Sequence, residues 1–446
     1  MSVPKNRESV RRPPSLALPR KGGGNGALRI EKLCRACVAP TQAFLSFGAL
    51  PLANALVAPD APSSEEERYP LTLTVCTSCR LVQLAETVDP AKLFRQYVYL
   101  SSMSPAFVEH AGRLARRLIA ERALGPASKV VEIASNDGYL LQHYREAGVP
   151  VIGIDPAVNV AQVAAQRDIQ TICEFFTAEL AGSLKARGEQ ADVLHANNVL
   201  AHVADLPDFV AGIAAILRPD GVAVIEFPYL RELIANLEFD TVYHEHLCYF
   251  SLTPLVALFR RCGLAVNQVE RIPVHGGSLR LFVQHAGAAG PHPSVADMLA
   301  QEIAWGVADD ATYRGFASAT TQLRDSIPSF LRQLRARGRS MAAYGASAKG
   351  ATLLNYCGIG RETIDAVFDR SPLKQGLAMP GVRIPIRAAD ELVRARPDYT
   401  LLLAWNFSDE IIAQQAEYCR NGGRFIVPVP SPRIVPAEAD SGHAPP

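Results

Sequence analysis

Short apolar runs alternate with amphipathic stretches through the middle of the chain. An apolar run, a tight turn and helix-spaced residues follow one another in 129–148, and a second apolar run, 149–156, ends in Asp155. Runs of this length, bounded by turn residues, predict buried strands. Residues 191–203 predict a further strand, and residues 208–230 a helix, a turn and another strand. Strands that alternate with helices in this way predict an α/β unit with a parallel sheet.

A second, shorter series of the same kind follows near the C-terminus. Residues 340–360 predict a strand, a turn and a helix, residues 364–376 a strand ending in Asp369, and residues 398–407 a later strand. Between the two series, residues 264–286 predict two strands joined by a Gly-rich turn. The two α/β units are therefore candidates for distant structural copies of one another.

The composition divides the 446 residues into six parts, and at about 150 residues per domain the length fits three domains. We predict a disordered basic tail (1–29), a cysteine module (30–105), a central α/β unit (106–293), a helical connector (294–338), a second α/β unit (339–435) and a disordered tail (436–446). Both tails contain too few apolar groups to offset the entropy of ordering.

Charge and hydropathy exclude several classes of function. The net charge is +1, so no overall field attracts the protein to nucleic acid or to an anionic membrane. No run reaches the roughly 18 apolar residues of a membrane span, and the N-terminus lacks the apolar core of a signal peptide. We expect a cytoplasmic monomer that binds neither nucleic acid nor membrane.

Four of the nine cysteines form two CxxC pairs, Cys34 with Cys37 and Cys76 with Cys79. Each pair can present two thiolates to one ion, and two pairs complete a tetrahedral Cys₄ site for Zn²⁺. A redox CxxC, the alternative, is typical of a single motif that opens a helix. A closed Cys₄ shell has no open position, so we predict one structural zinc ion per chain.

The central unit has the features of a nucleoside site. In a doubly wound sheet, an acid at the end of the second strand, here Asp155, can accept hydrogen bonds from ribose hydroxyls. A single glycine in the first turn, Gly138, argues against a pyrophosphate, and the acidic Glu132 and Asp137 suit a cation. S-adenosylmethionine, a sulfonium without phosphate, fits better, and the order of elements is that of a class I methyltransferase core. The alternative is an α/β domain with a vacant or different nucleotide site.

The predicted cofactor-binding residues lie at the carboxyl ends of three predicted strands. They are Glu132, Ala134, Asn136, Asp137, Gly138, Asp155, Asn197 and Asn198.

The tetrapeptide YHEH, Tyr243 to His246, places two imidazoles and a carboxylate beside a phenol. It follows the strand predicted at the end of 208–230, so we expect it on the carboxyl side of the sheet, where the crevice opens. Three interpretations remain: a general base, a metal site with His244 and His246 as ligands, or simple packing. The metal interpretation lacks an evident third ligand, and we expect His244 to support the structure.

A set of motifs in fixed order gives the chain a specific resemblance to a known family. The motifs are the two CxxC pairs, PLANAL, CRLVQL, LFRQYVYLSSMS, EIASNDGYLL, NNVLAHV, YHEHLCYFSL, HGGSLRLFV and YGASAKG, within residues 30–430. The sequence resembles the three-domain C-methyltransferases that methylate C3 of nucleotide-linked 4-keto-deoxysugars. The resemblance implies an N-terminal zinc domain, a central S-adenosylmethionine domain and a C-terminal Rossmann-like domain, with the sugar between domains.

The resemblance also assigns active-site positions, with His246 in the place of the base. The matching residues are Tyr99, His202, Tyr243, Glu245 and His246. Tyr97 competes with Tyr99 for the same role.

The chemistry agrees with this assignment. A carbon becomes nucleophilic when a proton leaves beside a ketone, and histidine is the usual base near neutral pH. Glu245 or Tyr243 could fix the tautomer of His246, while His202, Tyr99 or another donor meets the developing oxyanion.

In the second α/β unit, the turn at 345–350 resembles a phosphate cradle without being a Walker loop. We predict that Ser347, Lys349 and Lys374 help seat the diphosphate or nucleoside of a nucleotide-sugar substrate. The alternative is a supporting domain whose site is unused.

Two other functions remain open, methylation of an oxygen or carboxylate on another small acceptor and an RNA methyltransferase. Residues 34–100 hold five basic and six acidic side chains, whereas binding to a phosphate backbone needs clustered cations. This balance argues against the RNA methyltransferase.

Overall fold

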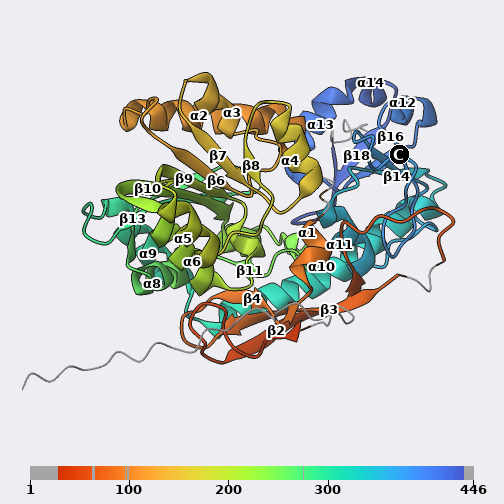
Figure 1. Cartoon of the computed structure of the whole chain (residues 1–446). Helices are drawn as coiled ribbons and strands as arrows, with labels where there is room; N and C mark the ends of the chain where they lie inside the picture. The colour runs from red at the N-terminus through yellow and green to blue at the C-terminus, as the bar shows by residue number, and fades with distance from the viewer. Residues whose placement is uncertain (1–28, 63–65, 96, 98–99, 275, 436–446) are drawn as a thin grey trace, which may run out of the picture.

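The computed structural model describes residues 29–435 except 63–65, 96, 98–99 and 275. Three sheets of four, seven and six strands organise these residues, and a two-stranded ladder accompanies the smallest. Figure 1 shows the seven-stranded sheet and the six-stranded sheet side by side above the four-stranded sheet. The predicted α/β fold, with a methyltransferase-type core and a second Rossmann-like unit, is confirmed.

The central sheet has five parallel strands and an antiparallel hairpin at one edge. Its order is β12 (Leu264–Ile272), β13 (Ser278–His285), β10 (Leu217–Pro228), β9 (Ala191–Asn197), β6 (Val130–Ile133), β7 (Val151–Ile154) and β8 (Thr171–Ile172). The parallel strands are almost wholly apolar because helices cover both of their faces.

Those helices form one layer on each side of the sheet (Figure 1). One layer contains α2 (Pro105–Glu121), α3 (Leu141–Glu146) and α4 (Val158–Ala165), and the other α5 (Ala178–Ala186), α6 (Leu206–Ile216) and α8 (Leu252–Arg261). Local capping fixes where they begin: Ser104 accepts a hydrogen bond from the amide of Phe107 at the start of α2, and Asp205 one from Asp208 at α6. Two short elements, η3 (Leu200–His202) and α7 (Leu230–Ala235), follow β9 and β10.

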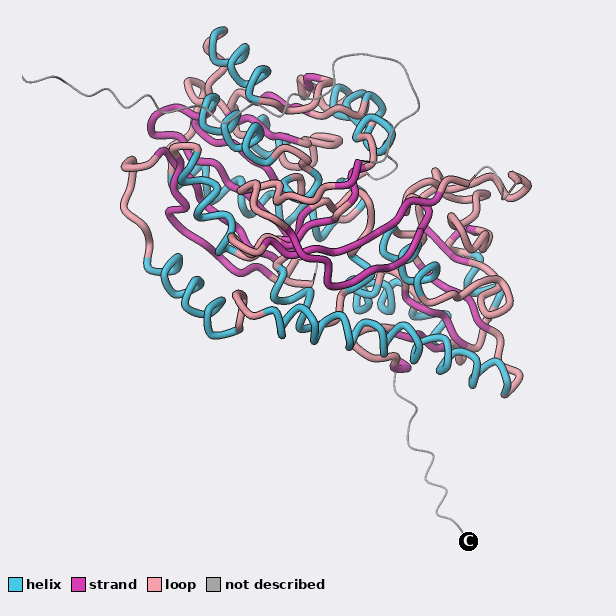
Figure 2. The backbone as a smooth tube through the Cα atoms, turned by 90° about the horizontal axis from the view of Figure 1, so that it is seen from below, coloured by secondary structure: helices cyan, strands magenta, loops and turns pink. Residues whose placement is uncertain are grey.

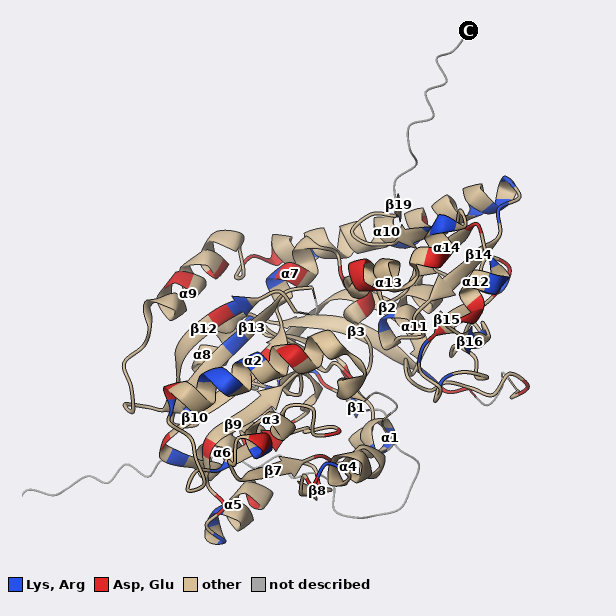
Figure 3. Cartoon of the chain, turned by 90° about the horizontal axis from the view of Figure 1, so that it is seen from above, with Lys and Arg blue, Asp and Glu red and all other residues tan. Residues whose placement is uncertain are grey.

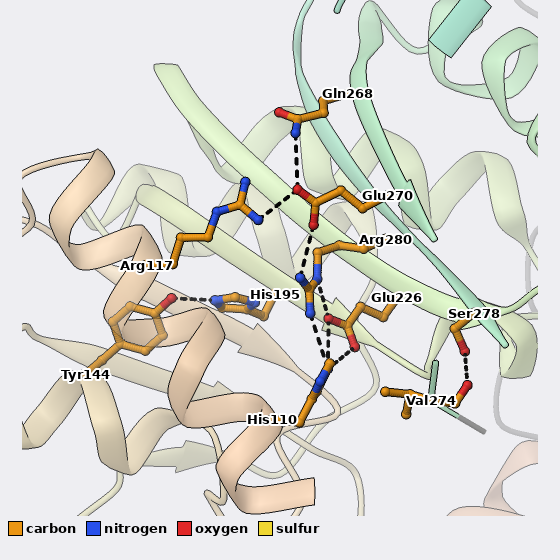
Figure 4. A network of polar contacts seen from close by, with 10 residues as sticks. All are labelled: His110, Arg117, Tyr144, His195, Glu226, Gln268, Glu270, Val274, Ser278 and Arg280. Atoms are coloured by element: carbon orange, nitrogen blue, oxygen red, sulfur yellow. Dashed lines mark hydrogen bonds and ion pairs between the residues drawn. The ribbon is translucent and has the colours of Figure 1, made fainter. Parts of the chain in front are cut away.

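A buried polar network joins α2 to the hairpin (Figure 4). The carboxylate of Glu226 on β10 accepts from Arg280 Nε on β13 at 2.6 Å and lies 3.1 Å from His110 Nε2 on α2. Arg280 also donates to Glu270 on β12, at 3.1 Å. These charges are paired and hydrogen bonded, as buried charges must be, so they hold the helix and the antiparallel edge in one arrangement.

The cysteine module is built on the four-stranded antiparallel sheet, and one of its strands comes from elsewhere in the chain. The order is β11 (Cys248–Tyr249), β4 (Val82–Leu84), β3 (Arg68–Cys76) and β2 (Thr41–Pro51). The ladder of β1 (Arg29–Ile30) with β5 (Glu86–Thr87) and the short helix α1 (Pro90–Phe94) complete the module. Because β11 follows the YHEH motif by one residue, the chain enters the sheet of the module just after the motif.

The C-terminal unit has five parallel strands and one antiparallel strand, β19, at an edge. Its order is β16 (Ile386–Ala388), β15 (Val367–Asp369), β14 (Met341–Tyr344), β17 (Tyr399–Leu402), β18 (Arg424–Val427) and β19 (Arg433–Val435). Its helices are α11 (Ala348–Tyr356), α12 (Glu391–Ala395), α13 (Ser408–Gln414) and α14 (Ala416–Arg420), with the 3₁₀ turn η5 (Trp405–Phe407) after β17. The strand-turn-helix predicted for 340–360 and the strand ending in Asp369 are both present.

The connector consists of two helices rather than one. The first, α9 (Pro293–Trp305), ends at Gly306, whose left-handed backbone (φ 90°) terminates the helix before α10 (Asp310–Ala336) begins. Figure 2 shows α10 running below the molecule toward the C-terminal unit. It packs on β2, and Arg80 of the cysteine module donates to Asp310 at 2.7 Å. The connector therefore packs against the module as well as linking the two α/β units.

Both predicted tails lie outside the described residues, except that Arg29, placed in the tail by composition, is paired in β1. Among the residues that the structure places, no helix is long and apolar enough to cross a membrane.

The carboxylate of Glu302 on α9 yields a prediction about stability. It is fully buried and accepts from the amides of Leu252 (2.6 Å) and Thr253 (2.9 Å) at the start of α8. We expect Glu302→Ala to lower the free energy of unfolding by about 2–4 kcal/mol, because two amides and a hydroxyl lose a charged acceptor. Asp297→Ala, on the exposed face of the same helix, is the control in urea denaturation. Equal losses for the two variants would contradict this assignment.

Candidate active site

A single cavity of about 1470 Å³ lies where the carboxyl ends of the strands in the central and C-terminal sheets meet. Its wall includes Asp155 and Asn197, which end strands of the central sheet, and Asp369, which ends β15. The cysteine module contributes Asn54, and the YHEH motif contributes Tyr243 and other side chains. Ligands of open α/β sheets bind at this edge, so the cavity is the candidate active site.

The turn after β6 and the end of β7 form one side of the cavity. Ala134 (φ 56°) and Asn136 (φ 50°) both have left-handed backbones, which cost energy for residues with a side chain and often occur at functional sites. The two oxygens of Asp155 accept from the amides of Asn136 and Ala157, each at 2.9 Å. Each oxygen retains a lone pair for a ligand hydroxyl.

The structure brings five of the eight predicted cofactor residues to this wall. Ala134, Asn136, Asp155, Asn197 and Asn198 line the cavity, whereas Glu132, Asp137 and Gly138 do not. Gly138 has φ 78°, and a Cβ on it would lie 2.4 Å from the side chain of Ile169. Glycine is therefore required at this position by the left-handed backbone of the turn and by its packing on Ile169, not by the approach of a ligand.

The two acids expected to suit a cation face other parts of the protein. Successive side chains of a strand point to opposite faces, and Glu132 lies on the face beneath α2 and α3. Burial raises the pKa of Glu132 well above its usual range, so this carboxyl stays protonated. Asp137 accepts from the amide of Ser102 and lies 3.5 Å from Arg167.

The remaining groups fit S-adenosylmethionine. Asn197, at the end of β9, lines the cavity, and its Oδ1 is buried without a hydrogen-bond partner in the described structure. Phe175 and Phe176 line the same part of the cavity and offer aromatic faces to an adenine ring. Sequence reasoning missed this pair, although two adjacent aromatic residues just after β8 are a visible signal.

A hydrogen-bonded tyrosine and histidine form the opposite side of the cavity. Tyr243 Oη donates to His246 Nε2 at 2.8 Å, and His246 Nδ1 lies 2.9 Å from the carbonyl oxygen of Thr241. A carbonyl can only accept, so Nδ1 carries a hydrogen and Nε2 is the basic nitrogen of the neutral ring. Burial raises the pKa of Tyr243 well above its usual range, so its hydroxyl remains a donor. The backbone of Thr241 thus fixes the tautomer of His246, a role that the sequence suggested for Glu245 or Tyr243.

His202, in η3, lies against the same ring. The His202 and His246 centroids are 4.9 Å apart in an edge-to-face arrangement, and Phe94 packs on the other side of His202. Burial lowers the pKa of His202 to about 4, so it is neutral near neutral pH. It can stabilise an oxyanion only by a hydrogen bond from the neutral ring, not by a positive charge.

The two middle residues of YHEH face the cysteine module. His244 Nε2 donates to the carbonyl oxygens of Tyr69 (3.2 Å) and Pro70 (3.1 Å) on β3. Glu245 Oε1 accepts from Asn54 Nδ2 at 2.7 Å, and burial raises the pKa of Glu245 to about 7. Asn54 lies in the PLANAL motif and lines the cavity, whereas Glu245 does not. Since His244 and His246 hydrogen bond to different parts of the protein, they do not form a metal site together.

Of the two candidate tyrosines before α2, only one can be placed. Tyr99 lies outside the described residues. Tyr97 lines the cavity, and its backbone amide and carbonyl both hydrogen bond to the side chain of Asn159.

The C-terminal unit forms the far wall of the cavity with Ser347, Lys349 and Lys374. Ser347 Oγ accepts from the amide of Gly350 and caps α11, and Lys374 Nζ donates to the carbonyl of Ala346 at 2.7 Å. The ammonium of Lys349 is fully buried and is not exposed to the cavity. The three side chains share one wall, but Lys349 points its charge away from it.

The four cysteines of the two CxxC pairs converge at the end of β3. Their sulfur atoms all lie within 4.8 Å of one another, with Cys34 and Cys79 at 3.5 Å and Cys37 and Cys76 at 3.4 Å. Tetrahedral Zn²⁺ with bonds of about 2.3 Å requires sulfur atoms about 3.8 Å apart. The residues therefore fit a closed zinc site, and among the described residues no other group of three or more potential ligands clusters in this way.

The sheet, the acid at the end of β7 and the cavity define a class I S-adenosylmethionine-dependent methyltransferase. Three family models match consecutive parts of the chain: a proposed zinc-binding domain (34–94), a methyltransferase domain (107–269) and a C-methyltransferase C-terminal domain (273–430). The chain belongs to the family of C-methyltransferases that combine these three domains, with S-adenosylmethionine and zinc as cofactors.

The chain is similar to individual proteins over different shares of its length. C-methyltransferase NovU of Streptomyces niveus is 41% identical over 89% of this chain and 94% of its own length. Trans-aconitate 2-methyltransferase of Paracidovorax citrulli is 32% identical over 28% of this chain and 48% of its own. The crystal structure of magnesium protoporphyrin IX methyltransferase from Synechocystis PCC 6803 with bound SAM covers 40% of this chain and 79% of its own, with 14% identity and a TM-score of 0.31.

The cysteine cluster predicts a metal content that elemental analysis can measure. We expect about one zinc ion per chain, and we expect Cys76→Ser to lose the ion and much of its solubility, because metal binding and folding are coupled. Cys173→Ser, at an exposed cysteine outside the cluster, should retain both. Stoichiometric iron, or wild-type protein without metal, would refute the zinc assignment.

The position of Asp155 predicts its effect on donor binding. We expect Asp155→Ala to lower the affinity for S-adenosylmethionine by tenfold or more, since a hydrogen bond to a charged group contributes about 1.5–3 kcal/mol. Asp369→Ala is a matched control, because that carboxylate also accepts two backbone amides, from Ala346 and Ser371, but in the other unit. Calorimetry that finds equal weakening for both variants would show a general loss of folding instead.

Proposed function

We propose that the enzyme removes the C3 proton of a nucleotide-linked 4-keto-deoxysugar and methylates the resulting enolate carbon. The observation that carries the proposal is the Tyr243–His246 pair, which presents a basic nitrogen to the same cavity as the donor side at Asp155. Methylation at oxygen needs a hydroxyl or carboxylate to lose its proton, whereas methylation at carbon needs a base beside an activating carbonyl. A single histidine with a defined tautomer suits that base.

In the first step, His246 Nε2 takes the C3 proton and the electron pair moves into the neighbouring ketone. In this structure the Tyr243 hydroxyl donates a hydrogen bond to Nε2, and this bond must break before Nε2 can accept the proton of the substrate. A neutral donor, His202 or a tyrosine at 97 or 99, donates a hydrogen bond to O4 and stabilises the negative charge that develops there. Asn54 and Thr241 hold Glu245 and His246 in place.

Bound S-adenosylmethionine supplies an electrophilic methyl group on a sulfonium. The protein then needs mainly to align the enolate carbon with that methyl group, and the cavity serves by holding both molecules. Its volume of about 1470 Å³ exceeds the usual 300–1,000 Å³ of a small-molecule site, as expected for two ligands.

The nucleotide of the substrate is proposed to bind at the C-terminal wall. There Asp369 ends the second strand and accepts two amides, at 2.6 and 2.7 Å, in the way that Asp155 does in the central unit. Lys374 and the turn that begins α11 border the same crevice and are proposed to face the diphosphate. This placement leaves the sugar near YHEH.

The proposed substrate is a small molecule rather than RNA. In Figure 3, basic and acidic residues intermingle on the elements seen from above, and no face of one sign stands out. A phosphate-backbone binder needs clustered cations.

Isotope exchange tests the proposed base separately from methyl transfer. In heavy water, with an unreactive donor analogue bound, we expect the enzyme to exchange the C3 hydrogen of a 4-keto-sugar nucleotide for deuterium. His246→Asn should abolish this exchange and reduce methylation by about 10²–10⁴-fold, the usual contribution of a general base. Mass spectrometry measures both.

Companion variants assign the roles around the base. Tyr243→Phe and Glu245→Gln should slow exchange without abolishing it, because these residues orient the site. Near-normal methylation by His246→Asn would remove the assignment, and loss of exchange only in His202→Asn or Tyr99→Phe would move it to that residue. Absence of exchange and methylation across a panel of 4-keto-sugar nucleotides would refute the substrate class.

A further inference from the structure

The ammonium group of Lys349 is buried between two units of the protein. Its Nζ has no hydrogen-bond partner in the described structure and lies 4.6 Å from the centre of the Trp405 ring. The nearest opposite charges are Asp240 and Glu238, which both belong to the central unit. A lysine at the start of a helix also opposes the helix dipole. These unfavourable features require compensation, and the carboxylates across the interface provide it.

Asp240 attracts the Lys349 charge more strongly than Glu238 does, without a direct hydrogen bond or ion pair to it in the described structure. It lies in the 3₁₀ turn η4 (Phe239–Thr241), and its side chain is fully buried. Asp240 Oδ2 accepts from Trp405 Nε1 at 2.6 Å, while Oδ1 has no hydrogen-bond partner in the described structure. Burial raises the pKa of Asp240 to about 6, and the charge of Lys349 opposes that rise. Trp405 of the C-terminal unit thus holds an aspartate of the central unit, and the Lys349 ammonium lies over the ring of the same tryptophan.

This contact lies one residue from the group that fixes the tautomer of His246. Thr241 follows Asp240 in η4, and its carbonyl oxygen is 2.9 Å from His246 Nδ1. The same turn is also supported by α11, where Thr352 Oγ1 donates to the carbonyl of Val242 at 3.3 Å. A shift of η4 would move the Thr241 carbonyl and release the imidazole.

We propose that Lys349 is a positioning residue: its ammonium packs on the Trp405 ring, which donates to Asp240, and its charge attracts Asp240, so that it fixes the Thr241 carbonyl and with it the orientation and tautomer of His246. The proposal rests on the proposed function only in calling His246 the base. It differs from the expectation that Lys349 binds the substrate's diphosphate. Two carboxylates beside the ammonium would repel a phosphate, and the ammonium is closed off from the cavity.

Nuclear magnetic resonance tests the proposal without substrate. Protein with ¹⁵N-labelled histidine reports which ring nitrogen of His246 carries the hydrogen, and the His246→Asn variant identifies the signals. We expect wild type to show a single form with the hydrogen on Nδ1, and Lys349→Met to show a mixture of tautomers. Lys374→Met, at the other lysine of the same wall, should leave the His246 signals unchanged. An unchanged His246 spectrum in folded Lys349→Met overturns the proposal.

Kinetics supply the second measurement. We expect Lys349→Met to lower kcat about 5- to 30-fold with little change in KM, within the usual range of coupling between contacting residues. Asp240→Asn/Lys349→Met removes both charges but keeps an acceptor for Trp405, and we expect it to recover part of the lost kcat. It also provides a folded test if the single variant is unstable. A double variant as slow as the single one, or a single variant with raised KM and normal kcat, would make Lys349 a substrate contact.

The outcomes separate this proposal from the function on which it rests. If no 4-keto-sugar is methylated but the His246 signals still depend on Lys349, the positioning role stands and the substrate class fails. If the sugar is methylated and the signals do not respond to Lys349, only the positioning role fails.

Discussion

The backbone hydrogen bonds between β11 and β4 insert the segment that follows YHEH into the sheet of the cysteine module, and the geometry of the candidate active site depends on them. The amide of Leu84 donates to the carbonyl of Leu247, and His244 donates to two carbonyls of β3. β3 ends at Cys76, a ligand of the zinc site. The metal, the sheet and the histidine-bearing segment therefore form one continuous structure, so a zinc ion with no chemical task still supports the chemistry.

The C-terminal unit holds the same segment from its other end, through Trp405 and Asp240. The two outer domains thus contact opposite ends of one short loop that the central unit supplies. Loops at the carboxyl edge of a sheet are usually the mobile parts of an α/β protein, because they are exposed and carry few buried contacts. Here packing on both sides replaces that mobility with a fixed position, as the base that we propose requires.

The predictions from sequence succeeded where chemistry depends on local spacing. Two CxxC pairs can close a zinc site wherever the intervening residues run, and an acid that ends a second strand reaches the same edge in any doubly wound sheet. For this reason the cysteine cluster and the placement of Asp155 agree with the structure. Spacing did not reveal that Glu132 lies on the buried face of β6, because apolar residues surround it on both sides in the sequence. Nor did it reveal that Asn54 reaches Glu245, 191 positions away.

The sequence by itself determined the type of each unit, the zinc ligands and the strand ends at which ligands gather, because periodicity, turn residues and ligand spacing are local properties of the chain. Only the tertiary structure decided which groups orient the side chains of the candidate active site. The carbonyl of Thr241, rather than the carboxylate of Glu245, sets the tautomer of His246, and the ammonium of Lys349 is buried over the Trp405 ring instead of being exposed to the cavity. The first contact joins two residues of one loop, whose backbone conformation no spacing rule gives. The second lies between domains, whose relative placement follows from the packing of many distant residues and leaves no pattern in a short stretch of sequence.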